Sequence, residues 1–296
     1  MLSTTNLWMS LAGLFFLFAG VLILRNELRS AQGWDKLISL APVFIAASLA
    51  CFAPEHFGGG PDYIQAMAPS WMPWHWFWPT FVGIALFAAA ASLIARKCMR
   101  LSSTMLGLMF FLFVCMIYLP SLLRHPENRF AWAIFLRDLS FCAGAWAITG
   151  LLTRTSSPQL SKFFVLFSRI VIAVSAVIYS IHHFLHPEFT PGVPLQKLMP
   201  SWIPIPTVMG YFTGAVLLIA GIALFLNKNP RIAAASIGAW MTALTVFPYL
   251  VILFLALDGS ATDINEGINY VADTLLYAGS ALAVASALPH DPERMK

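Results

Sequence analysis

Long apolar runs separated by short charged segments repeat along the whole chain. A bilayer core about 30 Å thick needs ~20 mostly apolar residues per helix. None of the runs alternates with the period of two that a barrel strand needs, and a helix satisfies its own backbone in lipid. The pattern therefore predicts an all-α membrane protein with about nine spans, at residues 7–24, 37–54, 75–95, 103–123, 130–152, 163–185, 206–226, 232–257 and 268–288.

The composition is typical of a protein whose surface is covered mainly by lipid. The chain of 296 residues is 59% hydrophobic and 10% charged, whereas soluble domains carry about 25% charged residues. The first run has no basic residue before it, so we expect a membrane span there and not a cleavable signal peptide.

The basic residues are divided unequally between the two sets of loops that nine spans create. One set holds Arg124, Arg129 and Lys197. The other holds twelve: Arg25, Arg29, Lys36, Arg96, Lys97, Arg100, Arg154, Lys162, Lys228, Arg231, Arg294 and Lys296. Because cytoplasmic loops are rich in Lys and Arg, the N-terminus is predicted outside and the C-terminus in the cytoplasm.

Several function classes lack support in the sequence. The net charge of +4 comes from short clusters between apolar runs, which gives no patch for nucleic acid. The four cysteines form no CxxC pair, which argues against a zinc site, a dithiol centre and a disulfide framework. No P-loop, GxGxxG, GxSxG or HExxH is present, and the sequence leaves open whether the protein is an enzyme.

An internal repeat organises the chain. Pro69-Ser70-Trp71-Met72-Pro73 recurs as Pro200-Ser201-Trp202-Ile203-Pro204, 131 residues later. Further matches are Gly83 with Gly214, Lys97 with Lys228, Arg100 with Arg231, Gly107 with Gly238 and, with short gaps, His56 with His183, Asp138 with Asp273 and Gly144 with Gly279. We predict an N-terminal helix and loop (1–36) and two parallel four-helix units (37–160 and 161–296), related by an axis along the membrane normal.

The tryptophans near these motifs have two interpretations, and so do the motifs themselves. Trp71, Trp74, Trp76 and Trp78 form either an interfacial aromatic belt or a wall on which a substrate stacks. The two proline-flanked motifs are either turns that lead into a helix or caps over a pocket.

The repeated unit resembles the DoxX-like family of small four-helix membrane proteins. The second half carries most of the resemblance, in Arg169, in the run His182 to Phe189, in Pro191-Gly192-Val193-Pro194 and in Pro200 to Pro204. The first half repeats it in Glu55-His56-Phe57 and Met67 to Pro73, but has Pro42 about where the second half has Arg169.

The resemblance implies a protein of the bacterial inner membrane. Its relatives include the membrane subunit of a thiosulfate:quinone oxidoreductase and a methylamine-utilisation membrane protein. It therefore implies quinone as a ligand, and another membrane or periplasmic subunit as the partner that supplies a redox centre.

The charged residues inside spans are the candidate functional residues. Asp138 and Asp273 are predicted about 12 Å and about 8 Å from the outer end of their helices, and His56 and His183 end helices on the same side. We predict an outer polar cavity lined by these four side chains. The aspartates serve either as links between helices or as a site for protons or a ligand.

Arg137 precedes Asp138 but projects ~100° away around the helix, so the two are not expected to face each other. Arg137 then needs another partner, either Asp273 or a ligand anion. Arg169 is a secondary candidate that we expect to extend toward the cytoplasmic surface.

The histidines and glutamates complete the candidate set. His56, His182, His183 and His186 are either haem or metal ligands or interfacial hydrogen-bonding groups. We assign no metal site. Glu55 and Glu188 are secondary candidates that we expect to be solvated or to cap helices.

Three hypotheses for function follow. The first is a redox-associated protein that handles quinone, and the second is a non-enzymatic transporter, lipid-handling protein or assembly factor. The third is a scaffold of an envelope complex.

Overall fold

The chain folds into a bundle of long helices. The computed structural model describes residues 3–58, 69, 71–193 and 197–289, and within these ranges nine helices are long and apolar enough to cross a membrane. The same ranges contain no strand beyond an isolated bridge between Phe189 and Leu198. The predicted all-α, multi-pass membrane class is therefore confirmed, and the apolar helix surfaces face lipid.

Five of the spans are single unbroken helices: α1 (Thr4–Ser30), α6 (Phe77–Ala95), α9 (Arg129–Leu152), α10 (Pro158–Leu185) and α11 (Pro206–Phe225). A sixth, α14 (Ala261–Ala287), begins seven residues before the predicted span. Its start is set by a capping box in which Ser260 and Asp263 bond each other's backbone N–H. Apolar runs underestimate helix length because polar first turns continue the helix beyond the lipid-facing segment.

The remaining spans are interrupted. The second consists of α2 (Trp34–Ile38), α3 (Ala41–Phe52) and α4 (Glu55–Gly58). The fourth runs from α7 (Met99–Phe113) through a π-helical segment (Val114–Tyr118) into α8 (Leu119–Arg124). The eighth runs from α12 (Pro230–Leu244) through a π-helical segment (Thr245–Tyr249), which is kinked at Phe247 where the backbone is extended, into α13 (Leu250–Ala256).

The two π-helical segments are equivalent positions of the repeat. Val114 and Thr245 begin them, 131 residues apart, which is the offset of the proline-flanked motifs. Both have a proline within or just after the segment, and such a residue removes a backbone donor and disturbs the helical ladder. The spacing of these two interruptions thus equals the spacing of the repeated motifs.

The proline-flanked motifs are turns in both halves. The Met72 N–H donates to the Pro69 carbonyl (2.9 Å), and the Ile203 N–H donates to the Pro200 carbonyl (3.1 Å). Each turn leads within a few residues into a helix, α6 or α11. Ser70, Met67, Ala68 and Pro194, and the cytoplasmic-set residues Arg294 and Lys296, lie outside the described residues.

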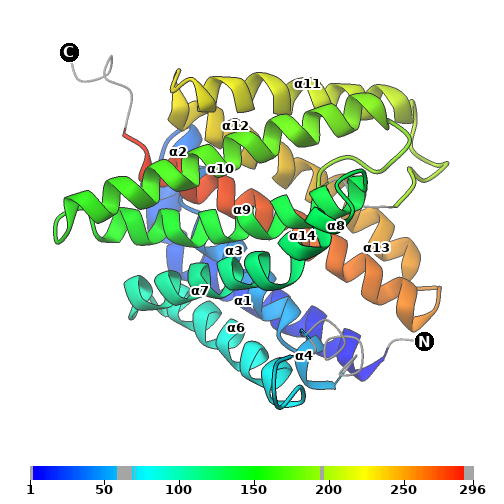
Figure 1. Cartoon of the computed structure of the whole chain (residues 1–296), viewed down its shortest axis with the longest axis horizontal. Helices are drawn as coiled ribbons and strands as arrows, with labels where there is room; N and C mark the ends of the chain where they lie inside the picture. Colours follow the sequence, from blue (N-terminus) through cyan, green and yellow to red (C-terminus); the bar gives the residue numbers. More distant parts are fainter. Residues whose placement is uncertain (1–2, 59–68, 70, 194–196, 290–296) are drawn as a thin grey trace.

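Helices α9 and α14 lie against each other in the middle of the bundle, and each also packs on the first helix of the other half, α9 on α10 and α14 on α3 (Figure 1). In the most apolar stretch of α14, 83% of the residues are buried, against 17% for α1. The centre of the molecule is therefore the α9–α14 contact, and α1 is a peripheral helix.

Glycines make this central contact close. A Cβ on Gly144 of α9 would lie 2.3 Å from the Ser280 hydroxyl of α14, and one on Gly279 would lie 2.9 Å from Ile45 of α3. Small residues of this kind let membrane helices approach closely.

We call the end where α1 begins the N-side and the end where α14 finishes the C-side; the predicted orientation makes the N-side external. The hairpin between α9 and α10 extends beyond the other helices on the C-side, at the left of Figure 1.

Candidate functional site

An ion cluster lies in the central α9–α14 contact. Arg137 of α9 pairs with Asp138 of the same helix (Nη2 to Oδ2, 2.9 Å) and with Asp273 of α14 (Nη1 to Oδ2, 2.9 Å). Asp138 is 4% exposed and Asp273 is 6% exposed. We call these three residues the ion cluster. It joins the last helices of the two halves.

One expectation about this cluster is wrong. Arg137 and Asp138 were predicted not to face each other, yet the Arg137 Nε also donates to the Asp138 carboxylate at 2.9 Å. Adjacent Cβ atoms do point ~100° apart on a helix. The arginine side chain is long enough to turn back along α9, so the direction of its Cβ does not decide what its guanidinium contacts. Asp273 as a partner of Arg137 is confirmed.

The charges of the ion cluster do not balance. Two carboxylates share one guanidinium, which leaves one negative charge in a buried, water-poor site. Moving one uncompensated charge from water into the protein interior costs on the order of several kcal/mol, even after relaxation. The composition of the cluster therefore favours the uptake of one proton or another cation.

A stripe of polar side chains connects this cluster with the N-side. Asn265, Asn269, Asp273 and Tyr277 recur at every fourth residue of α14, which places them on one face of the helix. The Asn269 amide donates to the Asn265 side-chain oxygen at 2.8 Å. Both amides also donate to the Glu55 carboxylate, at 3.2 and 3.3 Å. We call these residues, with Glu55, the polar path.

The polar path continues past Asp273 to the middle of the bundle. The Tyr277 hydroxyl lies 2.6 Å from the Ser175 hydroxyl, which also accepts a hydrogen bond from Ser140 at 3.1 Å. Beyond Tyr277, α14 consists of small and apolar residues, and the Ser280 hydroxyl donates to the Leu276 carbonyl of its own helix. In the described residues this row of polar side chains thus runs from the middle of the bundle to the N-side.

The sequence interpretation missed most of this path. Glu55 was expected to be solvated or capping, but it is partly buried and accepts from two asparagines of α14. The signal was present: three polar residues and a tyrosine at four-residue intervals in the last helix.

Two of the four candidate histidines, His183 and His56, are bonded to backbone groups. His183 is buried, and its Nε2 lies 3.1 Å from the Gly192 carbonyl and accepts from the Gly192 N–H. His56 Nδ1 lies 3.1 Å from the Phe52 carbonyl. The Nε2 of His183 is therefore occupied by the backbone of Gly192. No group of three or more His, Cys, Asp and Glu within the described ranges is arranged around a metal position.

The two remaining secondary candidates lie apart from the ion cluster. Glu188 is exposed and pairs with His186 at 3.2 Å. The Arg169 guanidinium donates to the Asn227 side chain, in the turn between α11 and α12 on the C-side.

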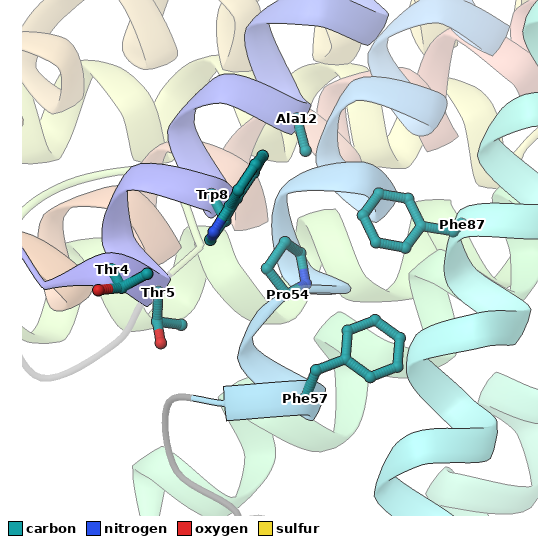
Figure 2. A pocket seen from close by; sticks show the side chains of 7 residues that line it. All are labelled: Thr4, Thr5, Trp8, Ala12, Pro54, Phe57 and Phe87. Carbon is teal, nitrogen blue, oxygen red and sulfur yellow. The ribbon is translucent and has the colours of Figure 1, made fainter.

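An apolar groove opens on the N-side beside α4 (Figure 2). Its volume is about 370 Å³, and it lies between α1, which provides Thr4, Thr5, Trp8 and Ala12, and α6, which provides Phe87. Pro54 and Phe57 complete the lining, with Pro54 between Trp8 and Phe87 in Figure 2. The Phe57 and Phe87 rings stack with centroids 6.2 Å apart. We call this the aromatic groove.

The comparisons with known proteins found nothing: no family model, curated protein or solved structure matches the chain. The class that the fold defines is an all-α, multi-pass membrane protein with a buried ion cluster.

Proposed function

We propose that the chain is a DoxX-like protein of the bacterial inner membrane that binds a quinone in the aromatic groove and exchanges protons with it through the polar path. The observation that carries this proposal is the position of α4. Pro54 and Phe57 line the groove, and Glu55, between them in sequence, belongs to the polar path.

The aromatic groove has the chemistry of a quinone-ring site. Trp8, Phe57 and Phe87 offer apolar ring faces, and Thr4 and Thr5 offer hydroxyl donors for a quinone carbonyl. Ligand sites are mostly apolar with a few polar groups that fix orientation, and they start at about 300 Å³. The groove borders α1, whose surface faces lipid, so an isoprenoid tail can leave sideways into the bilayer.

The polar path has the chemistry of a proton route. Reduction of a quinone to the quinol takes up two electrons and two protons. The electrons come from a redox partner subunit in this proposal, since the chain has no CxxC pair. The unbalanced charge of the ion cluster gives the path a group that takes up and releases a proton.

Quinone binding is the test. Purified full-length protein is titrated with a short-chain quinone by calorimetry, and organic extracts are analysed for native quinone. We expect Trp8→Ala and Phe57→Ala to weaken binding by tenfold or more, whereas Phe254→Ala, a matched exposed aromatic on α13, leaves it unchanged. Absence of quinone from the extract together with no heat of binding contradicts the proposal.

A second candidate function is ion-coupled transport, and the π-helical segments favour it. These segments pack against α9 and α14, the two helices that carry the ion cluster. Interrupted helices beside buried charges occur at transporter sites. Solute uptake by proteoliposomes that Asp273→Asn abolishes, with no bound quinone, would favour this candidate over the first.

A further inference from the structure

A second groove lies on the C-side, away from the ion cluster and the aromatic groove. It has a volume of about 580 Å³ and lies between the first turns of α10 and the end of α14. Residues from Pro158 to Arg169 contribute at intervals of three and four, so one face of α10 forms its wall over about 16 Å. We call it the basic groove.

The described residues that line the basic groove include three cations and no carboxylate. The cations are Arg154, Lys162 and Arg169. Two of them are held in place: Arg154 donates to the Ala287 carbonyl at the end of α14 (2.7 Å), and Arg169 donates to Asn227. The Arg169 Nε is buried and has no hydrogen-bond partner.

The N-terminus of α10 adds a further attraction for an anion. Helix α10 is 28 residues long, and its N-cap residue, Ser157, makes no side-chain capping bond. Pro158 and Ser161 of its first turns line the groove, at the positive end of the helix dipole.

Apart from Ser161, whose hydroxyl donates to the Gly150 carbonyl, the rest of the basic groove is apolar. Val165 and Leu166 of α10 face Leu288 and Pro289, and Leu166 is 53% exposed on the outer surface of the bundle. A ligand that satisfies the whole groove thus carries an anionic head and an apolar chain.

We propose that the basic groove is a binding site for an anionic phospholipid, with its phosphate at the three cations and an acyl chain along Val165 and Leu166. Charge complementarity and the apolar wall distinguish this ligand from free phosphate, which would leave the wall uncovered. The predicted orientation places the groove at the cytoplasmic leaflet, where basic pockets between membrane helices bind anionic headgroups.

Native mass spectrometry of the full-length protein tests the proposal. The protein is delipidated in detergent and exposed separately to phosphatidylglycerol, to phosphatidylcholine with the same chains, and to inorganic phosphate. We expect one phosphatidylglycerol to be retained and phosphatidylcholine to be bound at least tenfold more weakly. Equal retention of the two lipids would overturn the proposal. Saturation of the site by inorganic phosphate alone would also overturn it, because the ligand would then be a free anion and not a lipid.

Single and combined substitutions locate the site. Each of Arg154→Gln, Lys162→Gln and Arg169→Gln should weaken retention of phosphatidylglycerol about fivefold, and the three together should abolish it. Lys97→Gln, a cation in another C-side turn, is the matched control and should behave as wild type. Leu166→Ser tests the acyl wall without changing a charge, and should lower retention of the lipid while leaving folding, monitored by circular dichroism, intact, because Leu166 is 53% exposed. Wild-type retention by the triple variant refutes the assignment.

Discussion

Replacing Arg137 with glutamine removes the positive charge that two buried carboxylates share. Asp138 and Asp273 would then face each other without a counter-charge, although each is at most 6% exposed. Replacing Asp273 with asparagine instead leaves Arg137 paired with Asp138 alone, which is a neutral pair. We therefore expect Arg137→Gln to destabilise the protein far more than Asp273→Asn.

The geometry of the ion cluster sets the size of this difference in the free energy of unfolding. Each ion pair of the cluster spans 2.9 Å, for which Coulomb's law at an effective dielectric constant of 20 gives a gross attraction of about 6 kcal/mol. Desolvation offsets part of this, and breaking a buried pair by removing one partner reduces the free energy of unfolding by about 3–5 kcal/mol. For Asp273→Asn we expect a loss of about 1 kcal/mol, since the asparagine still accepts one hydrogen bond.

The assay is reversible unfolding of the purified protein in mixed micelles with increasing sodium dodecyl sulfate, followed by tryptophan fluorescence. A triple variant in which Arg137, Asp138 and Asp273 are all replaced by neutral residues of similar shape should recover most of the stability lost in Arg137→Gln. Wild-type stability of Arg137→Gln, or a larger loss in Asp273→Asn, would refute the charge argument.

Three further outcomes are expected. Asn269→Leu removes one donor to Glu55, and should slow quinone-linked proton uptake in proteoliposomes severalfold, followed with a pH-sensitive dye, while stability stays near wild type. Gly144→Ala places a methyl group 2.3 Å from the Ser280 hydroxyl, and should lower the free energy of unfolding by about 1–3 kcal/mol; an unchanged unfolding curve would contradict the close α9–α14 contact. Cys98 is exposed in the C-side turn after α6. In intact cells of a variant with Cys98 as the only cysteine, a membrane-impermeant maleimide should fail to label it and a permeant one should succeed; labelling by both would reverse the predicted orientation.

The partners of Arg137 show which side-chain contacts residue spacing along a helix can predict and which it cannot. Residue spacing on a helix fixes the directions of Cβ atoms, and this suffices for short side chains such as those of Asn265 and Asn269. It fails for arginine, whose guanidinium lies several bonds from the backbone and contacts whichever carboxylates the packing places within reach. The link from Glu55 to α14 joins residues about 210 positions apart, so no local pattern contains it.

The sequence by itself determined the class of this protein, because each apolar run long enough to cross a bilayer must satisfy its own backbone as a helix. It also contained the repeated motifs, whose equal spacing reappears in the two π-helical segments. Only the tertiary structure decided which buried polar groups meet. Helices α9 and α14, the last of each half, pack on each other, and they also pack on α10 and α3 respectively. That arrangement brings Arg137, Asp138 and Asp273 together. It depends on side-chain packing between distant segments, which hydropathy along the chain does not encode.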